Sequence, residues 1–196
     1  VVLSSTQDGY EGSGQGYRLK LPHIIASLGR SNKQMTLTQP MRWQAGDALE
    51  NFIRSSFLCD VELPNINHNV FSDSSLALTY SQVTGATLAQ NQTLLRQVYG
   101  LLMLAHYQTT PQDLRLLLDH PQHQIHLCFV GEHLVGLAWV AEEGNLDASL
   151  ARQIALGQRR IQGHLLAQIL SQQAGFSVAC ELSSWRIQRL VVTPSL

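Results

Sequence analysis

The second half of the chain begins with hydrophobic residues at helical spacing. Leucines three and four residues apart predict a helix over 90–105, and a second helix is expected over 111–119, with Thr110 as its cap and proline in its first turn. A long helical stretch follows over 150–173, with glycines that interrupt it near its middle. The pattern therefore predicts a helical pair early in this half and an interrupted helix later.

Strand patterns lie between and after these helices. Residues 125–130 and 134–141 are rich in β-branched and apolar side chains, and a three-residue turn with glycine joins them as a hairpin. Residues 185–192 predict one further strand. The order helix, helix, strand, strand, helix, strand predicts an α/β domain that starts with antiparallel strands.

The first half of the chain has a different pattern. Residues 1–5 form an apolar run before a glycine-rich turn, which is typical of a buried central strand of a parallel sheet. Apolar residues at helical spacing predict a helix over 47–57, with Asp47 as its cap. Residues 62–75 are rich in Asn and Ser and are typical of a linker. This part is expected to be the tail of an α/β sheet domain.

These patterns divide the chain into three regions. We expect the end of one α/β domain over 1–60, a linker over 61–78, and the first part of a second domain over 79–196. Strand-like apolar runs stand at both ends of the chain, where domains are usually polar and frayed. The chain is therefore expected to be a segment of a larger protein.

Charge and cysteine content narrow the classes of protein. The chain has 13 Lys and Arg against 14 Asp and Glu, and this near-neutral balance argues against a dedicated basic nucleic-acid domain. Three widely spaced cysteines are typical of buried thiols in a reducing compartment. No apolar stretch approaches the roughly 20 residues that span a bilayer. We expect a soluble, cytoplasmic protein without a membrane partner.

The last predicted strand resembles a strand of a known fold. Residues 186–194 (RIQRLVVTP) are similar to the central strand of the acetyl-CoA-dependent acyltransferases of the GNAT class, although Thr193 stands where that strand often has His. In that class a Gln/Arg-x-x-Gly-x-Gly/Ala loop follows the strand and holds the pyrophosphate of coenzyme A. Such a loop would begin just beyond Leu196.

Three further motifs resemble one family, the tRNA(Met) cytidine acetyltransferases. They are residues 5–14 (STQDGYEGSG), 39–43 (QPMRW) and 105–114 (AHYQTTPQDL), and they occur in the family's order. The family joins a RecD-like helicase module to a GNAT module. The resemblance implies the α/β class, with the end of a RecA/RecD-like P-loop sheet followed by the first part of a GNAT fold.

The same resemblance implies an activity. The family forms N4-acetylcytidine at the wobble position of elongator tRNA(Met), using acetyl-CoA and the hydrolysis of ATP or GTP. Its Walker loop and Mg-binding acidic segment would lie upstream of Val1, so this piece alone is expected to be inactive. Two alternatives stay open: a GNAT protein N-acetyltransferase, and a nucleic-acid-dependent NTPase or binding module without transferase activity.

Candidate nucleotide ligands come from the first region. Hydroxyl and carboxyl groups just beyond a central strand of a RecA-like sheet lie near the nucleotide, which makes Thr6 and Glu11 candidates. Arg42 becomes a candidate ATP ligand through its place in the family motif, because a guanidinium matches phosphate oxygens with several donors. The glycines that follow Glu11 lack the Gly-Lys-Ser/Thr of a Walker loop and are expected to form a turn.

Candidate residues for acetyl transfer come from the second region. The cytosine amine is weakly nucleophilic and must lose a proton, so His106 is the candidate general base or positioning residue, with Tyr107 beside it. The resemblance implies that the backbone of Leu190, Val191 and Val192 binds the pantetheine arm of acetyl-CoA.

Two other groups of residues have side chains that suit RNA phosphates or a metal ion. Arg152, Arg159 and Arg160 are expected along one side of a helix, either as a contact to RNA phosphates or as an exposed helical face. The histidines between 120 and 133 have no Cys or carboxylate that would complete a tetrahedral set, so they are expected in a solvated loop and no metal site is predicted.

Overall fold

The structure, a computed structural model, describes residues 25, 27–29, 31, 33, 35, 37–61, 77–105 and 110–193. Its helices and strands, in chain order, are α2 (Ala48–Ser56), β1 (Leu78–Thr84), α3 (Gly85–Gln90), α4 (Gln92–Ala105), α5 (Pro111–Asp119), β2 (His123–Val130), β3 (His133–Gly144), α6 (Ala148–Ala155), α7 (Leu165–Gln172), a 3-10 turn (Ser177–Cys180) and β4 (Ser183–Val192). The predicted helices and strands of the second half are therefore present, with one strand more than expected.

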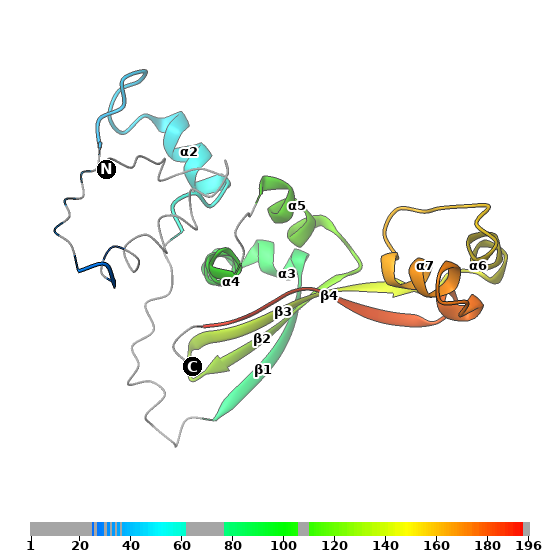
Figure 1. The fold of residues 1–196 in the computed structure, drawn as a ribbon. Helices are drawn as coiled ribbons and strands as arrows, with labels where there is room; N and C mark the ends of the chain where they lie inside the picture. The colour runs from blue at the N-terminus through cyan, green and yellow to red at the C-terminus, as the bar shows by residue number, and fades with distance from the viewer. Residues whose placement is uncertain are drawn as a thin grey trace.

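The four strands form one antiparallel sheet in the order β1-β2-β3-β4. Helices α3, α4 and α5 lie together on one face of this sheet (Figure 1). The sequence did not predict β1, because nearly all of its side chains are exposed and it carries no buried hydrophobic face. An edge strand of this kind is held by backbone pairing, which hydrophobic patterning does not reveal.

The helices begin where short polar side chains cap them. Asp47 accepts hydrogen bonds from the backbone of Leu49 and Glu50 at the start of α2. Thr110 and Asp113 form a reciprocal capping box at the start of α5. Asn91 accepts from the backbone of Leu94 and separates α3 from α4, so the single helix expected over 90–105 begins two residues later, behind a shorter one.

The main core lies between the sheet and helices α4 and α5. Its largest fully buried side chains include Val98, Leu101, Leu102, Leu117, Ile125 and Leu127. Leu58 and Val61, which follow α2, pack into the same core. Beside them Arg96 and Asp60 form an ion pair at 2.8 Å. The end of the first predicted region is thus anchored on α4.

The outer parts of β3 and β4 run beyond the helical layer and carry α6, α7 and the 3-10 turn at their end (Figure 1). We call residues 140–187 the arm. The arm has a small hydrophobic cluster of its own, made by Ala151, Ile154, Ala167 and Cys180. The helical stretch predicted over 150–173 is two helices, and Arg159 and Arg160 lie in the loop between them.

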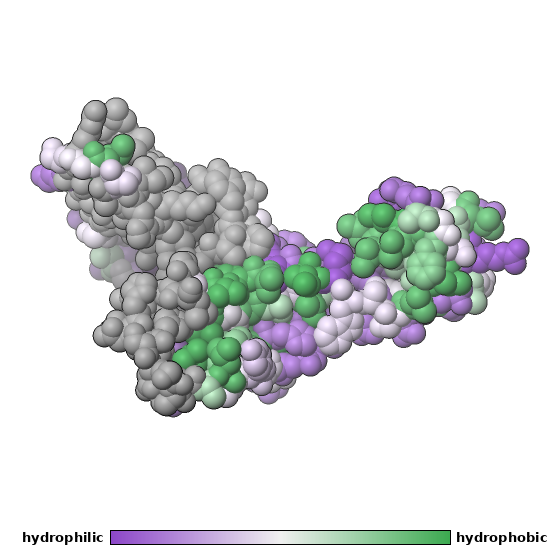
Figure 2. Space-filling view, turned by 60° about the horizontal axis from the view of Figure 1, so that its bottom comes forward, coloured by the Kyte–Doolittle hydropathy of each residue, from purple (hydrophilic) through white to green (hydrophobic). Residues whose placement is uncertain are grey.

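β4 contains a bulge at its centre. Trp139 pairs with Arg189 but the next residue, Val140, pairs with Ile187, so Gln188 is an extra residue in β4. The large apolar side chains of β4 (Trp185, Ile187, Leu190 and Val192) are exposed on the face of the sheet away from the helices. Hydrophobic patches are visible on the sheet and at the end of the arm in Figure 2.

Candidate functional site

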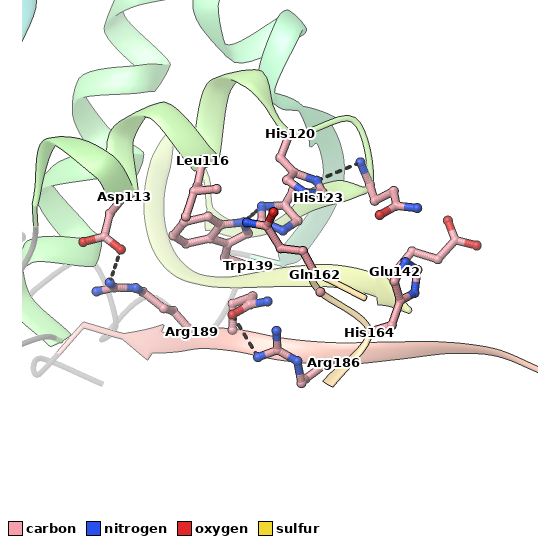
Figure 3. Close-up of a pocket in the computed structure, with 13 residues that line it drawn as sticks. Asp113, Leu116, His120, His123, Trp139, Glu142, Gln162, His164, Arg186 and Arg189 are labelled. Atoms are coloured by element: carbon pink, nitrogen blue, oxygen red, sulfur yellow. Dashed lines mark hydrogen bonds and ion pairs between the residues drawn. The ribbon is translucent and has the colours of Figure 1, made fainter. Parts of the chain in front are cut away.

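A pocket of about 570 Å³ lies at the base of the arm. Helix α5, the start of β2, the centres of β3 and β4, and the loop before α7 contribute its walls (Figure 3). The bulge in β4 places Arg186, Gln188 and Arg189 together in this lining. A regular strand would direct Arg186 and Arg189 to opposite faces of the sheet, because they are three residues apart. The bulge therefore assembles the basic wall of the pocket.

One carboxylate joins α5 to β4. Asp113 Oδ1 accepts from Arg189 Nη2 at 2.6 Å, and both side chains are largely buried. Asp113 Oδ2 accepts from the backbone N–H of Thr110 at 2.7 Å and from its hydroxyl at 2.9 Å. Because both oxygens are engaged, Asp113 fixes the start of α5 against the strand that carries Arg189.

A second carboxylate joins the arm to the pocket. Glu143, which is 2% exposed, forms an ion pair with Arg186 Nε. Its other oxygen accepts from the backbone N–H of Leu166 at 2.7 Å, in the first turn of α7. Arg186 also donates from Nη1 to Gln188 Oε1 at 3.0 Å. Glu143 thus holds Arg186 in the pocket wall and satisfies a helix N-terminus at the same time.

One wall of the pocket is aromatic. Trp139 Nε1 donates to His123 Nδ1 at 3.2 Å, and the rings of His120 and His123 stack with centroids 4.1 Å apart. Burial, with a smaller effect of the neighbouring His120, lowers the pKa of His123 to about 4. At neutral pH His123 is therefore a neutral imidazole that accepts from the indole. The expectation of a solvated histidine loop is wrong for His123, which is buried because it begins β2.

The histidines do not converge on one point. His126 packs its ring against Trp185, with centroids 5.3 Å apart, whereas His123 contacts Trp139. Within the part of the chain that the structure describes, no three His, Cys, Asp or Glu side chains form a group suited to a metal ion. Among the described helices, none has both the length and the apolar character needed to cross a membrane.

The nucleotide candidates all belong to the first region, residues 1–60. Arg42 is exposed in the segment before α2, where the next residue, Trp43, donates from Nε1 to Glu50 at 2.6 Å. Thr6 and Glu11 lie outside the described residues. Arg42 therefore remains a prediction, with its guanidinium accessible to a ligand.

As a test of the predicted ATP site, replacing Arg42 by alanine in the full-length protein is expected to lower ATP hydrolysis by about 10- to 100-fold, because hydrogen bonds from a charged donor contribute roughly 1.5–3 kcal/mol. Acetyl-CoA binding should be unchanged. Arg42→Lys is the control, since it keeps the charge but not the planar donor set, and it should recover only part of the rate. Steady-state phosphate release measures both variants, and wild-type ATPase activity in Arg42→Ala would remove the assignment.

The acetyl-transfer candidates divide into two sets. His106 and Tyr107 lie outside the described residues. In β4 the side chain of Val191 is buried in the core, whereas those of Leu190 and Val192 are exposed on the opposite face.

The basic group is not on one helix. Arg152 belongs to α6, whereas Arg159 and Arg160 follow it in the loop that leads to the pocket, and all three are exposed. The expectation of one helical side is wrong, because α6 ends at Ala155 and Gly157 adopts a φ of +70°. The loop nonetheless brings Arg159 and Arg160 close in sequence to Gln162, which lines the pocket.

Sequence reasoning did not single out Asp113, Trp139, Glu143, Arg186 or Arg189 as site residues. A signal was present in β4, since two arginines lie among the apolar residues of this strand, and buried charges need partners. Their partners are 43 and 76 residues away in sequence, which spacing alone does not indicate.

Comparison with known proteins gives two family matches. Residues 1–60 match the family described as RNA cytidine acetyltransferase NAT10/TcmA, helicase domain, and residues 97–196 match GNAT acetyltransferase 2. These matches confirm the expected fold class, a helicase-like part followed by a GNAT fold.

Curated relatives match along the chain. The tRNA(Met) cytidine acetyltransferase TmcA of Vibrio cholerae is 38% identical over 194 residues, covering 99% of this chain and 27% of the relative. The TmcA proteins of Photorhabdus asymbiotica and Nitrosococcus halophilus are 39% and 34% identical, over 98% and 100% of this chain and 27% and 26% of the relatives. The chain thus spans about a quarter of the length of these relatives. It belongs to the tRNA(Met) cytidine acetyltransferase family, with residues 1–60 in the helicase domain and residues 97–196 in the GNAT acetyltransferase domain.

Proposed function

We propose that this chain is part of an RNA acetyltransferase that forms N4-acetylcytidine at the wobble position of elongator tRNA(Met), using acetyl-CoA and the hydrolysis of ATP or GTP. The observation that carries the proposal is the similarity, along nearly the whole chain, to relatives named tRNA(Met) cytidine acetyltransferase. The regions are then the end of a helicase module over 1–60, a linker over 61–78 and the first part of a GNAT module over 79–196.

The free edge of β4 supports the acetyl-CoA assignment. Thr193 N–H donates to Val135 O at 2.8 Å, so Thr193 and, by alternation, Val191 direct their backbone groups toward β3. The N–H and C=O groups of Leu190 and Val192 then point to the other side, where no described strand pairs with β4. An extended chain with amide groups, such as pantetheine, can bind such an edge as an added strand does.

In this proposal Leu190 and Val192 hold the pantetheine arm through their backbone, and Val191 keeps the strand in place through its buried side chain. His106 takes a proton from the N4 amine as that nitrogen bonds to the acetyl carbon, and the carbon–sulfur bond breaks so that coenzyme A leaves as a thiolate and is protonated to the thiol. Tyr107 helps to position the base. Arg42, Thr6 and Glu11 belong to the ATP site, with Mg²⁺ expected through residues upstream of Val1.

His106→Ala in the full-length protein is expected to reduce acetyl transfer to tRNA by at least about 100-fold, the usual loss when a general base is removed. Acetyl-CoA affinity should stay unchanged, because His106 is not assigned to that site. Single-turnover acetylation with labelled acetyl-CoA gives the rate and calorimetry gives the affinity. Turnover close to that of the wild type would show that another group takes the proton.

The experiment that tests the function is the measurement of N4-acetylcytidine in purified tRNA(Met) by mass spectrometry. Deletion of the gene should remove the modified nucleoside, and the intact full-length gene should restore it. Persistence of N4-acetylcytidine in the deletion strain, together with loss of acetylation on a protein, would favour the protein N-acetyltransferase. If the deletion removes neither N4-acetylcytidine nor acetylation of a protein, and the purified protein hydrolyses NTPs, the NTPase alternative is favoured.

A further inference from the structure

We infer that the pocket at the base of the arm binds one unstacked nucleobase of the RNA substrate, and that Arg159 and Arg160 bind the phosphates beside it. The inference rests on the proposed function and deepens it by giving the acceptor base a place and a set of contacts. Four features of the pocket carry it: its charge balance, its apolar walls, the direction of its donors and its position on β4.

The charges of the pocket are largely neutralised within the protein. Arg189 is paired with Asp113, and Arg186 with Glu143. Of the lining carboxylates, Glu142 stands outside these pairs and accepts from Ser183 Oγ at 3.1 Å. Much of the remaining lining is uncharged hydrogen-bonding groups, including the amides of Gln122, Gln162 and Gln188 and the neutral His123. A phosphate would require unpaired cations, and both lining arginines already have an anion. A neutral planar heterocycle is the ligand that such a lining suits.

The walls also have an apolar and a planar part. Leu116 lines the pocket, and Trp139, which is 3% exposed, lies behind the guanidinium of Arg189, 5.8 Å from its ring centroid (Figure 3). Unstacked bases bind against aromatic rings and guanidinium planes. The volume of about 570 Å³ lies within the range of roughly 300–1,000 Å³ that is usual for small-molecule sites.

Two contacts fix the direction of the donors. Arg186 can only donate, so its hydrogen bond to Gln188 Oε1 leaves the Gln188 amide NH₂ as the group that faces a ligand. His164 Nδ1 accepts from the backbone N–H of Gly144 at 2.9 Å, which places the proton of a neutral ring on Nε2. Donors of this kind suit a base edge with two acceptors, such as O2 and N3 of cytosine. The N4 amine is then left without a partner and free to react.

The position of the pocket agrees with this assignment. Gln188 is two residues before Leu190, about 7 Å along the strand at roughly 3.3 Å per residue. A base held beside Gln188 therefore lies next to the strand edge proposed for acetyl-CoA. The loop wall opposite is well fixed, because Gln168 Nε2 donates to the carbonyls of Gly163 at 2.7 Å and Ile161 at 3.1 Å. Arg159 and Arg160 are exposed in the same loop, three and two residues before Gln162 of the lining, and are therefore assigned to the flanking phosphates.

The test uses the full-length protein without acetyl-CoA and an RNA stem–loop that carries a fluorescent cytosine analogue at the acceptor position of its loop. Unstacking of the analogue raises its fluorescence. Gln162→Trp fills the mouth of the pocket, and Gln158→Trp is the matched control, because Gln158 is exposed in the same loop but does not line the pocket. Gln122→Trp obstructs the pocket from the opposite wall.

The wild type and Gln158→Trp should raise the fluorescence on binding. Gln162→Trp and Gln122→Trp should lose that rise and weaken RNA binding by tenfold or more, with acetyl-CoA affinity unchanged in all four proteins. The double variant Arg159→Ala/Arg160→Ala should weaken binding and flatten its salt dependence, but should keep the fluorescence rise at saturation.

A normal fluorescence rise in Gln162→Trp and Gln122→Trp, or no rise in the wild type, would overturn the inference. The outcome is separate from that of the proposed function. A base that enters the pocket in a protein that forms no N4-acetylcytidine would refute the acetylation and leave the pocket assignment standing. N4-acetylcytidine formed at the wild-type rate by both tryptophan variants would refute the pocket assignment and leave the acetylation standing.

Discussion

Gly144→Ala is expected to lower the free energy of unfolding of the arm by at least about 4 kcal/mol, which is exceptional for a single methyl group. Gly144 ends β3 with a φ of +83°, and a Cβ at this position would overlap the carbonyl oxygen of Leu182, with the carbonyl carbon only 3.0 Å away. That carbonyl cannot move freely, because it accepts from the backbone N–H of Asn145 at 3.1 Å. The two ends of the helical part of the arm would therefore separate.

Gly157→Ala is the matched control for this prediction. Gly157 has a similar φ of +70°, but nothing lies within 4 Å of a Cβ built there. Gly157→Ala should lower the free energy of unfolding of the arm by only about 1–2 kcal/mol, which is the usual cost of a left-handed conformation in a residue with a Cβ. Hydrogen exchange of residues 146–182 in the full-length protein measures the local opening free energy. Equal effects of the two substitutions would mean that the close approach to Leu182 is not a constraint.

Glu143→Ala is expected to lower the free energy of unfolding of the arm by roughly 3 kcal/mol. The substitution leaves Arg186 without its anion and the backbone N–H of Leu166 without its acceptor. Because the Arg186 side chain is 31% exposed, water compensates part of the loss, so the effect should fall at the lower end for a broken buried pair.

Two further variants separate the contributions at this position. Glu143→Gln keeps an acceptor for Leu166 but loses the charge, and it should give an intermediate effect. Glu142→Ala removes the neighbouring carboxylate, which is partly exposed and accepts from Ser183 Oγ at 3.1 Å, and it should lower the free energy of unfolding by less than about 1 kcal/mol. Thermal unfolding and hydrogen exchange report all three. Equal losses at 142 and 143 would contradict the role assigned to Glu143.

Local chemistry made much of the fold predictable. Thr110 with Pro111 and Asp47 marked helix starts that the structure contains, because a cap needs only neighbouring residues. The hairpin between β2 and β3 followed from two apolar runs joined by a turn that contains glycine. β1 was not predicted, because its stability comes from pairing with β2, and the paired residues are 40 to 52 positions apart in the sequence.

The candidate site was less predictable than the fold. The motifs pointed to His106, Arg42 and the backbone of β4, residues whose neighbours along the chain make them recognisable. The pocket depends instead on pairs such as Asp113 with Arg189, which meet only when α5 packs beside β4. It also depends on the bulge at Gln188, and a single extra residue in a strand leaves no clear mark on its hydrophobic pattern.

The extra residue, Gln188, changes which sequence positions of β4 face away from the helices. Before Gln188 the apolar side chains occupy odd positions, Trp185 and Ile187, and after it they occupy even ones, Leu190 and Val192. Loss of Gln188 would make Ile187 and Arg189 neighbours in a regular strand with the same pairings to β3. Arg186 and Arg189 would then be two residues apart and would still share a face, so the pocket would lose only the Gln188 amide. Loss of Ile187 as well would make Arg186 and Arg189 neighbours on opposite faces, and one of them would leave the pocket wall. Chains that differ by the single bulge residue can therefore keep the basic wall.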